Sequence, residues 1–574
     1  MYIEWVPNRN SPPSILLRES YRQDGKVRKR TLANLTHWSP ELVQQFQNLL
    51  QGSHTIESLE STFEITRSLP HGHIHAILGT IQRFGLDKLI APRTSRNRRL
   101  VIAMIVSRLA FPVSKLATTR TFHPESCTNT LGDLLGIEGA TTDELYGAMD
   151  WLLARQTQIE QRLAQQYLQS GSLVLFDLSS TYLEGEHCPL AKRGYSRDRK
   201  RGTLQIVFGL LCNAQGAPVA VEVFSGNTSD PKTLQNHLTK LQQRFNLQRG
   251  VLVGDRGMLA NKQIHQVLKQ TPGWQWIGAL KSEQIRLLVV AQAFDVGALQ
   301  QQWVLEFQAA GYPDERLIAC YNSSLAKQRS QTRQSLLTAT EAEFTKIVKA
   351  TQRQRNPLQG KDKIALRVGK VMNRFKVAKH FEITISETLF SYQRNDASIL
   401  AESNLDGIYM LRTSIKAESM ATAEVVRAYK SLSRVEQAFR CLKSVDLRIR
   451  PIFHRLENRV KSHVLLCFLA YHVEWQMRQA LAPLLFAEDD LEAAQQKRGS
   501  IVDAMKKSDS AYRKATTKRS AEDLPIHSFR SLLEDLATIT KNRIQPQSGL
   551  PCFEKVTRPT PLQHRIFELL EVAL

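Results

Sequence analysis

The sequence lacks most features that mark secreted, zinc-binding or membrane-embedded proteins. Its seven cysteines include no Cys-x-x-Cys pair, which excludes a zinc ribbon or a dithiol redox motif and favours a reducing compartment. The longest apolar run of the C-terminal third, Val464 to Tyr471, is far shorter than the roughly 20 residues of a membrane span. The opening residues, MYIEWVPNRN, lack the basic stub and apolar run of a signal peptide. We therefore expect a soluble intracellular protein with no membrane partner.

Positive charge is what the sequence has in excess. The 574 residues include 77 Lys and Arg against 54 Asp and Glu, a formal net charge of +23, while the hydrophobic share, 42%, is that of an ordinary folded protein. A chain of this length needs several domains. An excess of cations this large favours a polyanionic partner, and nucleic acid is the first candidate. A ribosome-associated protein, or a soluble protein that is simply very basic, is the alternative.

The chain divides into five predicted regions, and their pattern favours an α/β fold. Residues 1–36 form a small β element, with a hairpin signal at Asp24-Gly25 between two extended runs. Residues 37–170 are mostly helical. A catalytic core is expected over 171–284 together with 401–480, an insertion domain over 285–400, and a peripheral polar and helical region over 481–574.

The core pattern is three strands, a helix, a strand, a helix and a strand. The strands are expected at 173–176, 205–213, 218–226, 251–254 and 274–280, and the helices at 231–245 and 262–270. Within the insertion we expect a helix near 338–352 and extended stretches at 364–375 and 381–392. A strand at 405–413 then leads to a long helix that carries Glu436, and a second helix follows at 456–481.

Two aspartates follow apolar strand signals directly: LVLF precedes Asp177 and VLVG precedes Asp255. The ends of strands are where an α/β sheet presents residues to a ligand. With Glu436 these acids could hold two divalent ions for phosphodiester cleavage, because hard cations prefer oxygen ligands. Taken singly, Asp177 could be a strand-end cap, and Asp255 could belong to the turn Gly254-Asp255-Arg256-Gly257.

Glu436 lies on the predicted helix with Tyr429 and Lys443 seven residues before and after it, so the three share one face. Arg440 lies on the same side. A hydroxyl, a carboxylate and two cations in one stripe suit a metal-bound phosphate. The alternative is an exposed helix with an ordinary Glu–Arg pair.

Five motifs together resemble the DDE transposases of bacterial insertion sequences, in the group with a β-rich insertion before the third acid. They are LVLFDLSSTYLEG around Asp177, KRGYSRDRKRGTLQIVFGLL at 192–211, VEVFSGNTSDPKTL at 221–234, VLVGDRGML at 251–259 and YKSLSRVEQAFRCLKS at 429–444. The resemblance spans about 170 to 480. It implies a ribonuclease H-like core, a mixed five-stranded sheet with helices, interrupted by the β-rich insertion.

The resemblance also implies the chemistry of the site. Asp177, Asp255 and Glu436 would be the catalytic residues and would bind two Mg²⁺ ions, which Mn²⁺ could replace. The glutamate helix is similar to the family's Tyr–Arg–Glu–Lys signature at Tyr429, Glu436 and Lys443. The arginine position holds Leu432 instead, which leaves Arg434 or Arg440 to make that phosphate contact.

Further DNA contacts are expected from the basic segment Lys192 to Arg201, which contains one acid, Asp198. A solvated basic loop is the alternative for that segment. The expected DNA-binding residues are Tyr429, Lys443, Arg440, Arg434, Arg197, Arg199, Lys200, Arg201 and Arg256.

The resemblance implies a DNA transposase that binds the terminal inverted repeats of its mobile element, cleaves strands and joins them to target DNA. Double-stranded DNA would be its partner, a homodimer its active form, and the prokaryotic cytoplasm and nucleoid its location. One alternative is a catalytically silent DNA-binding protein derived from a transposase. A second is a ribonuclease H-like nuclease without strand transfer.

Overall fold

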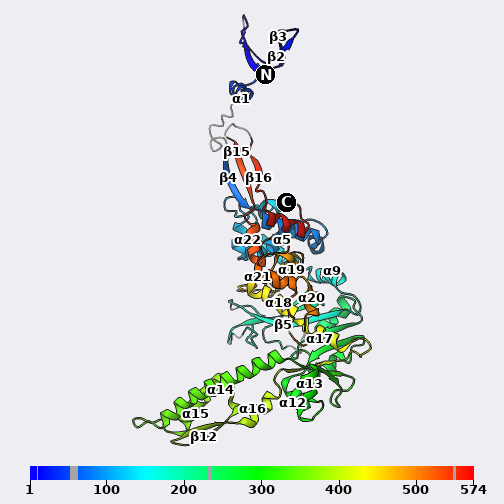
Figure 1. Ribbon diagram of the computed structural model, residues 1–574, viewed down its shortest axis with the longest axis vertical. Helices are drawn as coiled ribbons and strands as arrows, with labels where there is room; N and C mark the ends of the chain where they lie inside the picture. Colours follow the sequence, from blue (N-terminus) through cyan, green and yellow to red (C-terminus); the bar gives the residue numbers. More distant parts are fainter. Residues whose placement is uncertain are drawn as a thin grey trace. The chain divides into compact units, whose positions relative to one another are not determined.

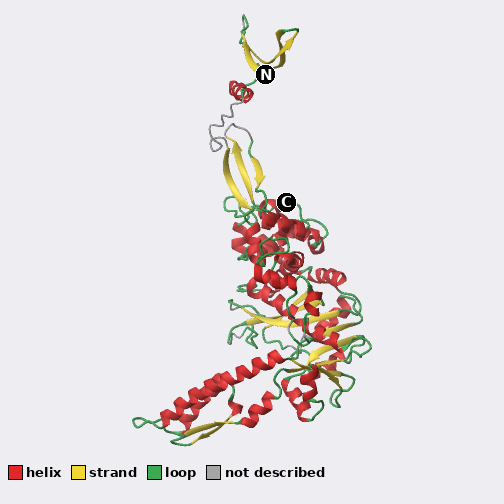
Figure 2. Cartoon of the chain, in the orientation of Figure 1, coloured by secondary structure: helices red, strands yellow, loops and turns green. Residues whose placement is uncertain are grey.

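The structure is a computed structural model, and it describes the chain except for residues 10, 52–62, 186, 199, 201, 230–233, 499, 504 and 547–550 and the side chains of residues 444 and 445. The chain forms two compact units (Figures 1 and 2). The first contains Met1–Pro70 and Ile539–Arg558, and the second contains His71–Thr538 and Pro559–Leu574. The helices of the described residues include none with the length and apolar character that crossing a bilayer requires.

The first unit contains two small antiparallel sheets. Strands β1 (Tyr2–Val6), β2 (Ser14–Gln23) and β3 (Lys26–Asn34) form one, beside helix α1 (Pro40–Leu50). The predicted hairpin is confirmed: Gln23 pairs with Lys26, and the two turn residues Asp24 and Gly25 have φ values of 50° and 75°, as an Asp-Gly turn favours. Strands β4 (Phe63–Pro70), β15 (Thr540–Pro546) and β16 (Phe553–Val556) form the other sheet.

A helical layer begins the second unit. Its main helices are α3 (Gly72–Arg83), α5 (Arg96–Ala110), α8 (Thr142–Leu153) and α9 (Gln156–Tyr167), with α4 (Leu86–Ile90), α6 (Lys115–Arg120) and α7 (Leu131–Leu135) between them. The prediction that residues 37–170 are mostly helical therefore agrees with this layer. A capping box between Thr141 and Glu144 starts α8. The long helix α19 (Glu457–Ala480) packs against α5, α8 and β7 (Pro218–Ser225). Helices that precede the sheet in the sequence and a helix that follows it therefore share one core.

An eight-stranded mixed sheet forms the centre of the second unit, which confirms the α/β class. Its order is β10-β11-β14-β9-β8-β5-β6-β7, and β5, β8 and β9 run parallel. The other strands are β5 (Leu173–Tyr182), β6 (Gln205–Asn213), β8 (Gly250–Val253), β9 (Trp274–Ala279), β10 (Val304–Phe307), β11 (Arg316–Tyr321) and β14 (Ile408–Thr413). Five core strands were predicted, and the further strand predicted at 405–413 is confirmed as β14, which pairs with β9. Strands β11 and β10 of the insertion then extend the sheet beyond β14.

Short helices connect these strands. The chain passes through α10 (Leu234–Thr239) and the π-helical turn Lys240–Arg244 before β8, and through α11 (Asn261–Gln263) and the π-helical turn Ile264–Leu268 before β9. Helices α12 (Ser282–Val290) and α13 (Val296–Gln302) follow β9. They pack with β11 and β14 around a core that includes Leu299, Leu317 and Met410.

The insertion is mainly helical in its described residues, so the β-rich insertion was a wrong prediction. Helix α14 (Ser323–Thr351) packs on α15 (Lys361–Phe375), and the strands β12 (Phe381–Ile385) and β13 (Phe390–Arg394) precede α16 (Asp396–Ser403). The stretch 364–375, predicted as extended, is part of α15. Its buried residues Ile364 and Val368 are four apart and therefore share one helical face. The predicted extended stretch at 381–392 is confirmed as the β12–β13 hairpin.

The C-terminal region is less peripheral than predicted. It contains α20 (Leu491–Gln496), α21 (Asp509–Thr517), α22 (Phe529–Leu536) and α23 (Pro561–Leu570). Both α22 and α23 pack against α3, and Leu532, Leu536, Ile566 and Leu570 are fully buried. Their burial contributes stability to the helical layer.

Candidate active site

The strand register brings the two predicted aspartates together. Strands β5 and β8 pair in parallel from Leu173 opposite Val251 to Leu175 opposite Val253. Asp177 and Asp255 each lie two residues beyond the last pair, so both continue the face of Leu175 and Val253 on neighbouring strands. The prediction that the first strand ends at Asp177 was wrong. Strand β5 continues to Tyr182 because it still pairs with β6, and Asp177 marks the point where β8 has ended.

Asp255 is both a turn residue and a candidate ligand. Its Oδ1 accepts hydrogen bonds from the backbone N–H groups of Gly257 at 3.0 Å and Met258 at 2.8 Å. The turn follows Gly254, where a Cβ atom would lie only 2.0 Å from the Met258 side chain. These bonds orient the carboxylate, and the turn interpretation and the ligand interpretation are therefore compatible.

Negative charge converges on Asp177. Burial, then the neighbouring carboxylate of Asp255 and, to a smaller extent, Glu436 raise the pKa of Asp177 to about 7, while Arg197 opposes the rise. The Leu178 N–H donates to Asp177 Oδ1 at 2.7 Å. Three carboxylates close together in a partly buried place repel one another when they are ionised. A bound cation would offset this repulsion.

Glu436 approaches this site from helix α18 (Leu432–Arg440), which packs on β5 and β6 (Figure 1). The buried Phe439 ring meets Phe208 of β6 edge-on, with ring centroids 5.3 Å apart. Glu436 is exposed but precedes Phe439 by three residues, so it lies on the same side of the helix, at the edge of the packed face. The same packing that anchors α18 therefore presents its carboxylate to solvent and ligand.

The predicted long glutamate helix is broken into three pieces. Helix α17 (Thr422–Lys430) carries Tyr429, α18 carries Glu436, and a π-helical turn, Cys441–Val445, carries Lys443. The break comes at Ser431, whose hydroxyl donates to the Ala428 carbonyl at 2.6 Å, a side-chain bond that competes with regular helix geometry. Three separate pieces therefore carry the residues that were expected on one stripe.

Tyr429 nevertheless belongs to the acidic site. Burial raises the pKa of its hydroxyl to about 12, and Asp255, Asp177 and Glu436 contribute to that rise while Arg256 opposes it. The hydroxyl therefore stays protonated near neutral pH and can donate a hydrogen bond beside the three carboxylates.

Comparison with known families decides what this site belongs to. The family model described as "Transposase DDE domain" matches residues 169–473, more than half of the chain. The chain belongs to the DDE transposases. A second model, "IS1634 family transposase, N-terminal domain", matches residues 4–59, which identifies the protein as a bacterial insertion-sequence transposase. It is therefore an enzyme that cleaves DNA and transfers strands, and it uses divalent metal ions.

The remaining comparisons add little. No curated protein matches the transposase in sequence. Among solved structures, a "piggyBac transposase synaptic complex with hairpin DNA" is similar at 9% identity and a TM-score of 0.33, covering 81% of this chain and 76% of that chain. No argument below depends on that likeness.

The transposase holds Lys443 in an ion-pair network. Lys443 Nζ lies 2.9 Å from Asp198 Oδ1, and Arg450 Nη1 lies 2.7 Å from Asp198 Oδ2. Lys443 is 9% exposed, and burial lowers the pKa of its ammonium group while Asp198 raises it. Sequence reasoning found Lys443 but missed that Asp198 and Arg450 accompany it, since the acid and the arginine lie 252 residues apart.

The other predicted DNA contacts differ in their surroundings. The Arg434 guanidinium donates to the Ala214 carbonyl and is half-buried, so it stabilises the turn between β6 and β7. Arg256 and Arg440 are exposed, and exposed Lys200 lies 3.7 Å from the Tyr182 ring centroid. Arg197 lies close enough to Asp177 to lower its pKa. Arg199 and Arg201 lie outside the described residues.

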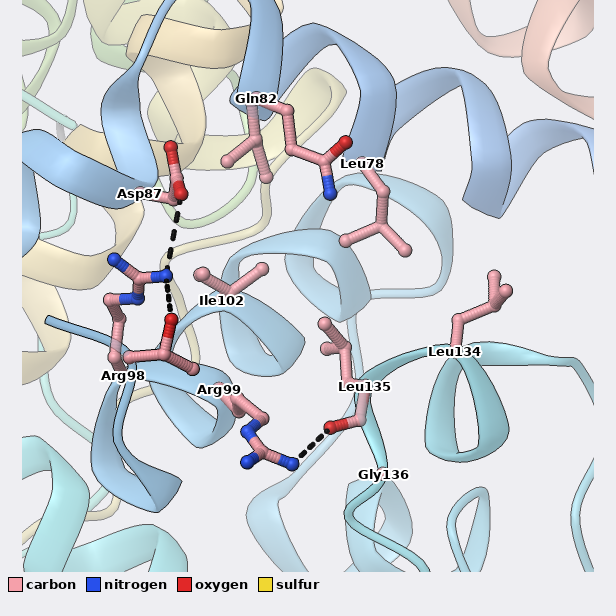
Figure 3. A pocket seen from close by; sticks show the side chains of 11 residues that line it. Leu78, Gln82, Asp87, Arg98, Arg99, Ile102, Leu134, Leu135 and Gly136 are labelled. Carbon is pink, nitrogen blue, oxygen red and sulfur yellow. Dashed lines mark hydrogen bonds and ion pairs between the residues drawn. The ribbon is translucent and has the colours of Figure 1, made fainter. Parts of the chain in front are cut away.

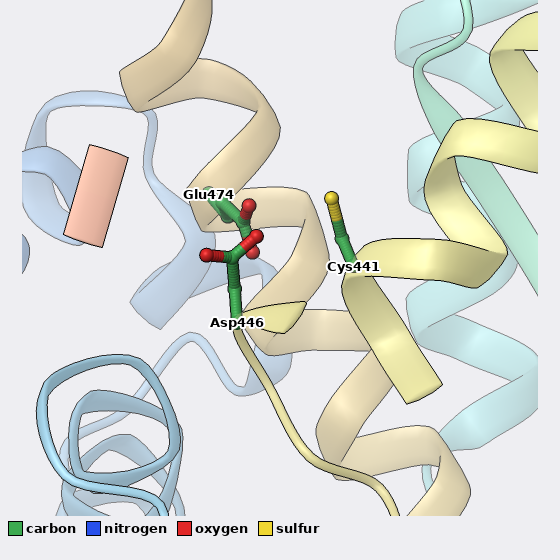
Figure 4. Close-up of side chains that lie close together, drawn as sticks. All are labelled: Cys441, Asp446 and Glu474. Carbon is green, nitrogen blue, oxygen red and sulfur yellow. The ribbon is translucent and has the colours of Figure 1, made fainter. Parts of the chain in front are cut away.

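Cys441, Asp446 and Glu474 form a second cluster of possible ligands (Figure 4). It is the only group of three in the described residues whose ligand atoms all lie within 4.8 Å of one another. Arg478 pairs with Asp446 at 2.9 Å and with Glu474 at 2.6 Å. Burial raises the pKa of Glu474 to about 8. We interpret the cluster as a polar network that joins the end of the glutamate segment to α19, since Arg478 already contacts both carboxyl groups.

A cavity of about 330 Å³ lies among α3, α4, α5 and α7 (Figure 3). Arg98 pairs there with Asp87 at 3.5 Å, and Arg99 donates to the Leu135 carbonyl at 3.3 Å. Its apolar walls include Leu78 and Ile102. Asp177, Asp255 and Glu436 do not line this cavity.

Proposed function

We propose that Asp177, Asp255 and Glu436 are the catalytic residues of this transposase and together hold two Mg²⁺ ions, with Mn²⁺ able to replace them. The observation that carries the proposal is the shared β5–β8 register, which aligns the two aspartates, together with the charge interaction of Asp177 with Asp255 and Glu436. The donor set fits these ions, because all three side chains offer carboxylate oxygens and hard cations prefer oxygen.

When bound, the divalent ions supply an activated water and stabilise charge on the reacting phosphate. The protein's own groups prepare the site for DNA. The turn bonds from Gly257 and Met258 hold the Asp255 carboxylate in one orientation. The protonated Tyr429 hydroxyl beside the acids is a donor for a phosphate oxygen, and Arg197 brings positive charge close to Asp177.

We interpret β5 to β9 as the ribonuclease H-like core. Their spatial order is β7-β6-β5-β8-β9, with β6 antiparallel to β5 and with β8 and β9 parallel to it. The first acid is on the central strand β5 and the second follows β8, as the family resemblance implies. The residues between β9 and β14 then constitute the insertion.

The remaining assignments concern DNA and assembly. We propose that exposed Arg256, Arg440 and Lys200 contact phosphates beside the acids, with Arg197 and Lys443 close by. The helical region within 37–170 would recognise the terminal inverted repeats, and a homodimer would be the active form. The packing of α19 on α5 and α8 argues for testing end recognition in the full chain, because an isolated N-terminal fragment would expose that core.

Three isosteric variants test the metal site: Asp177→Asn, Asp255→Asn and Glu436→Gln. Each should reduce Mg²⁺-dependent nicking of a duplex carrying the transposon end by at least about a thousandfold, because a lost ligand impairs both water activation and charge stabilisation. Affinity for the duplex should hold or rise, since a negative charge is removed. The asparagine at 255 keeps an oxygen for the Gly257 and Met258 N–H groups, so folding is preserved.

Matched controls come from exposed acids on helices of the C-terminal region, Asp509→Asn on α21 and Glu492→Gln on α20. Both should nick like the wild type. If folded Asp177→Asn and Asp255→Asn proteins nick at near wild-type rates, the assignment is wrong. If the wild type binds transposon ends but nicks nothing with either Mg²⁺ or Mn²⁺, a catalytically silent DNA-binding protein is the better interpretation.

A further inference from the structure

Nearly half of the net positive charge lies in one short part of the insertion. Residues 346–379 contain eleven Lys and Arg against a single acid, Asp362, a net charge of +10 in a chain whose total is +23. These residues span the end of α14, all of α15 and the chain up to β12. They lie outside the acidic site and outside the basic segment 192–201.

Helix α15 arranges four of these cations along one face. Lys363, Arg367, Lys370 and Arg374 are all exposed, and their spacing of four, three and four residues keeps them on one side of a helix. We call these four residues the basic stripe. The buried face of α15, with Ile364 and Val368, packs against α14 and the hairpin (Figure 1).

The stripe is not neutralised by the protein itself. In the part of the chain that the structure describes, Lys363, Arg367 and Lys370 form no ion pair, whereas Lys379 pairs with Glu402 and Lys346 with Glu343. Like charges three and four residues apart on a helix destabilise it. A polyanion bound along the stripe would neutralise these positive charges and so remove their mutual repulsion.

The surface beside the stripe is open. A Cβ atom added at Gly369 would meet nothing within 4 Å, and Leu366 is 63% exposed. From residue 363 to 374 the helix rises about 16 Å. Duplex DNA carries about one phosphate charge per 1.7 Å of its axis, so a backbone segment of matching length can meet all four cations.

We propose that the basic stripe of α15 binds the phosphate backbone of duplex DNA during transposition, in a contact independent of base sequence. The proposal rests on the transposase function and adds a DNA-binding surface within the insertion. Lys and Arg that contact phosphates orient a duplex without reading it, so the contact would hold DNA against the protein while other residues select the transposon end.

The test uses the full chain with three substitutions together: Lys363→Gln, Arg367→Gln and Lys370→Gln. Affinity is measured by fluorescence anisotropy over a range of salt concentrations with a chelator present, on an end-containing duplex and on a random duplex of equal length. The log–log salt slope should become shallower by about 3, since each lost phosphate contact changes it by about 1. The loss of affinity should be equal on both duplexes.

The control is Lys506→Gln, Lys507→Gln and Arg513→Gln, which lowers the net charge by the same amount at exposed positions of the C-terminal region. Its slope should stay within about 1 of the wild-type value. Equal losses in both triple variants would mean that only total charge matters and would overturn the proposal, as would an unchanged slope in the stripe variant. Glutamine preserves helix propensity, and circular dichroism checks the fold.

A single-site pair sharpens the test. Leu366→Glu brings a negative charge beside the stripe and should weaken binding, while Leu366→Gln, which has the same shape without the charge, should not. Equal affinities for the two variants would contradict the proposal. Because binding is measured without metal, these outcomes do not depend on the assignment of Asp177, Asp255 and Glu436.

Discussion

The part of the central sheet from β5 to β9, with α18, carries clustered carboxylates, whereas the insertion helices α14 and α15 carry clustered cations, and the two regions arrange these charges differently. The sheet gathers carboxylates at the edge of buried strands, where backbone pairing and turn bonds orient them. The insertion spreads cations over the outer face of a helix. Metal ligation needs oxygens in fixed positions, whereas a phosphate backbone can be met by long, adaptable side chains. The comparison teaches that side chains suited to metal ions are held in fixed orientations by the backbone, whereas side chains suited to phosphates can remain long and adaptable.

The largest expected contrast comes from removing one core ring in each region. Phe208 supports α18, and Phe344 packs on Phe381 and Phe390 in the separate insertion core. Each change to Ala should cost about 3–5 kcal/mol where it occurs. Phe208→Ala should abolish nicking. Phe344→Ala should increase hydrogen exchange in α14 and α15 and leave nicking measurable. Loss of nicking in both would show that the two cores unfold as one.

The ion pairs around Asp198 give the next largest effect. Asp198→Asn should destabilise the protein by about 2 kcal/mol in urea unfolding, because Lys443 and Arg450 would both lose a partly buried partner. Asp509→Asn, whose carboxylate is 92% exposed, removes a surface pair with Lys497 and should cost less than about 0.5 kcal/mol. Equal effects of the two changes would contradict the buried network.

The pH dependence of stability tests the cluster of Glu474 and Arg478. Burial raises the pKa of Glu474 from 4.5 to about 8, so the folded state keeps a proton that the unfolded chain loses between these values. Wild-type stability therefore falls as pH rises through that window. Glu474→Gln removes this dependence, and its stability relative to wild type should rise with pH by at most about 1.4 kcal/mol per unit. A constant difference between pH 5 and 8 would contradict the assigned shift.

The smallest effect is a gain in the insertion. Gly369 lies within α15, and an added Cβ would meet nothing within 4 Å. Gly369→Ala should stabilise the insertion helix by about 0.5–1 kcal/mol, because it restricts the unfolded chain and improves helix propensity. Thermal unfolding should show the gain, and nicking should be unchanged. The corresponding change Gly254→Ala should destabilise the central sheet, since its Cβ would lie 2.0 Å from Met258 Cε and 3.2 Å from Leu259 Cγ, and both of these side chains are buried and have little room to move.

Local patterns were sufficient to predict much of the central sheet. Apolar runs predicted β6, β7, β8 and β9, and the motifs around Asp177 and Asp255 predicted a DDE transposase. Local patterns gave a wrong prediction in the insertion. Residues 364–375 were expected to be extended, and an extended strand would not place the four cations of the basic stripe on one face. A helical spacing of Ile364, Val368 and Phe375 was the signal that could have found it.

The sequence by itself determined the chemical inventory: a large positive charge, acids directly after strand signals and the order of motifs that identifies the family. Only the tertiary structure decided which groups meet. The strand register aligns Asp177 with Asp255, and an ion pair joins Lys443 to Asp198. A hydrogen bond joins the Arg434 guanidinium to the Ala214 carbonyl. These outcomes depend on contacts between residues 78 to 245 positions apart, which are selected by burial and hydrogen bonding in the folded chain rather than by local sequence.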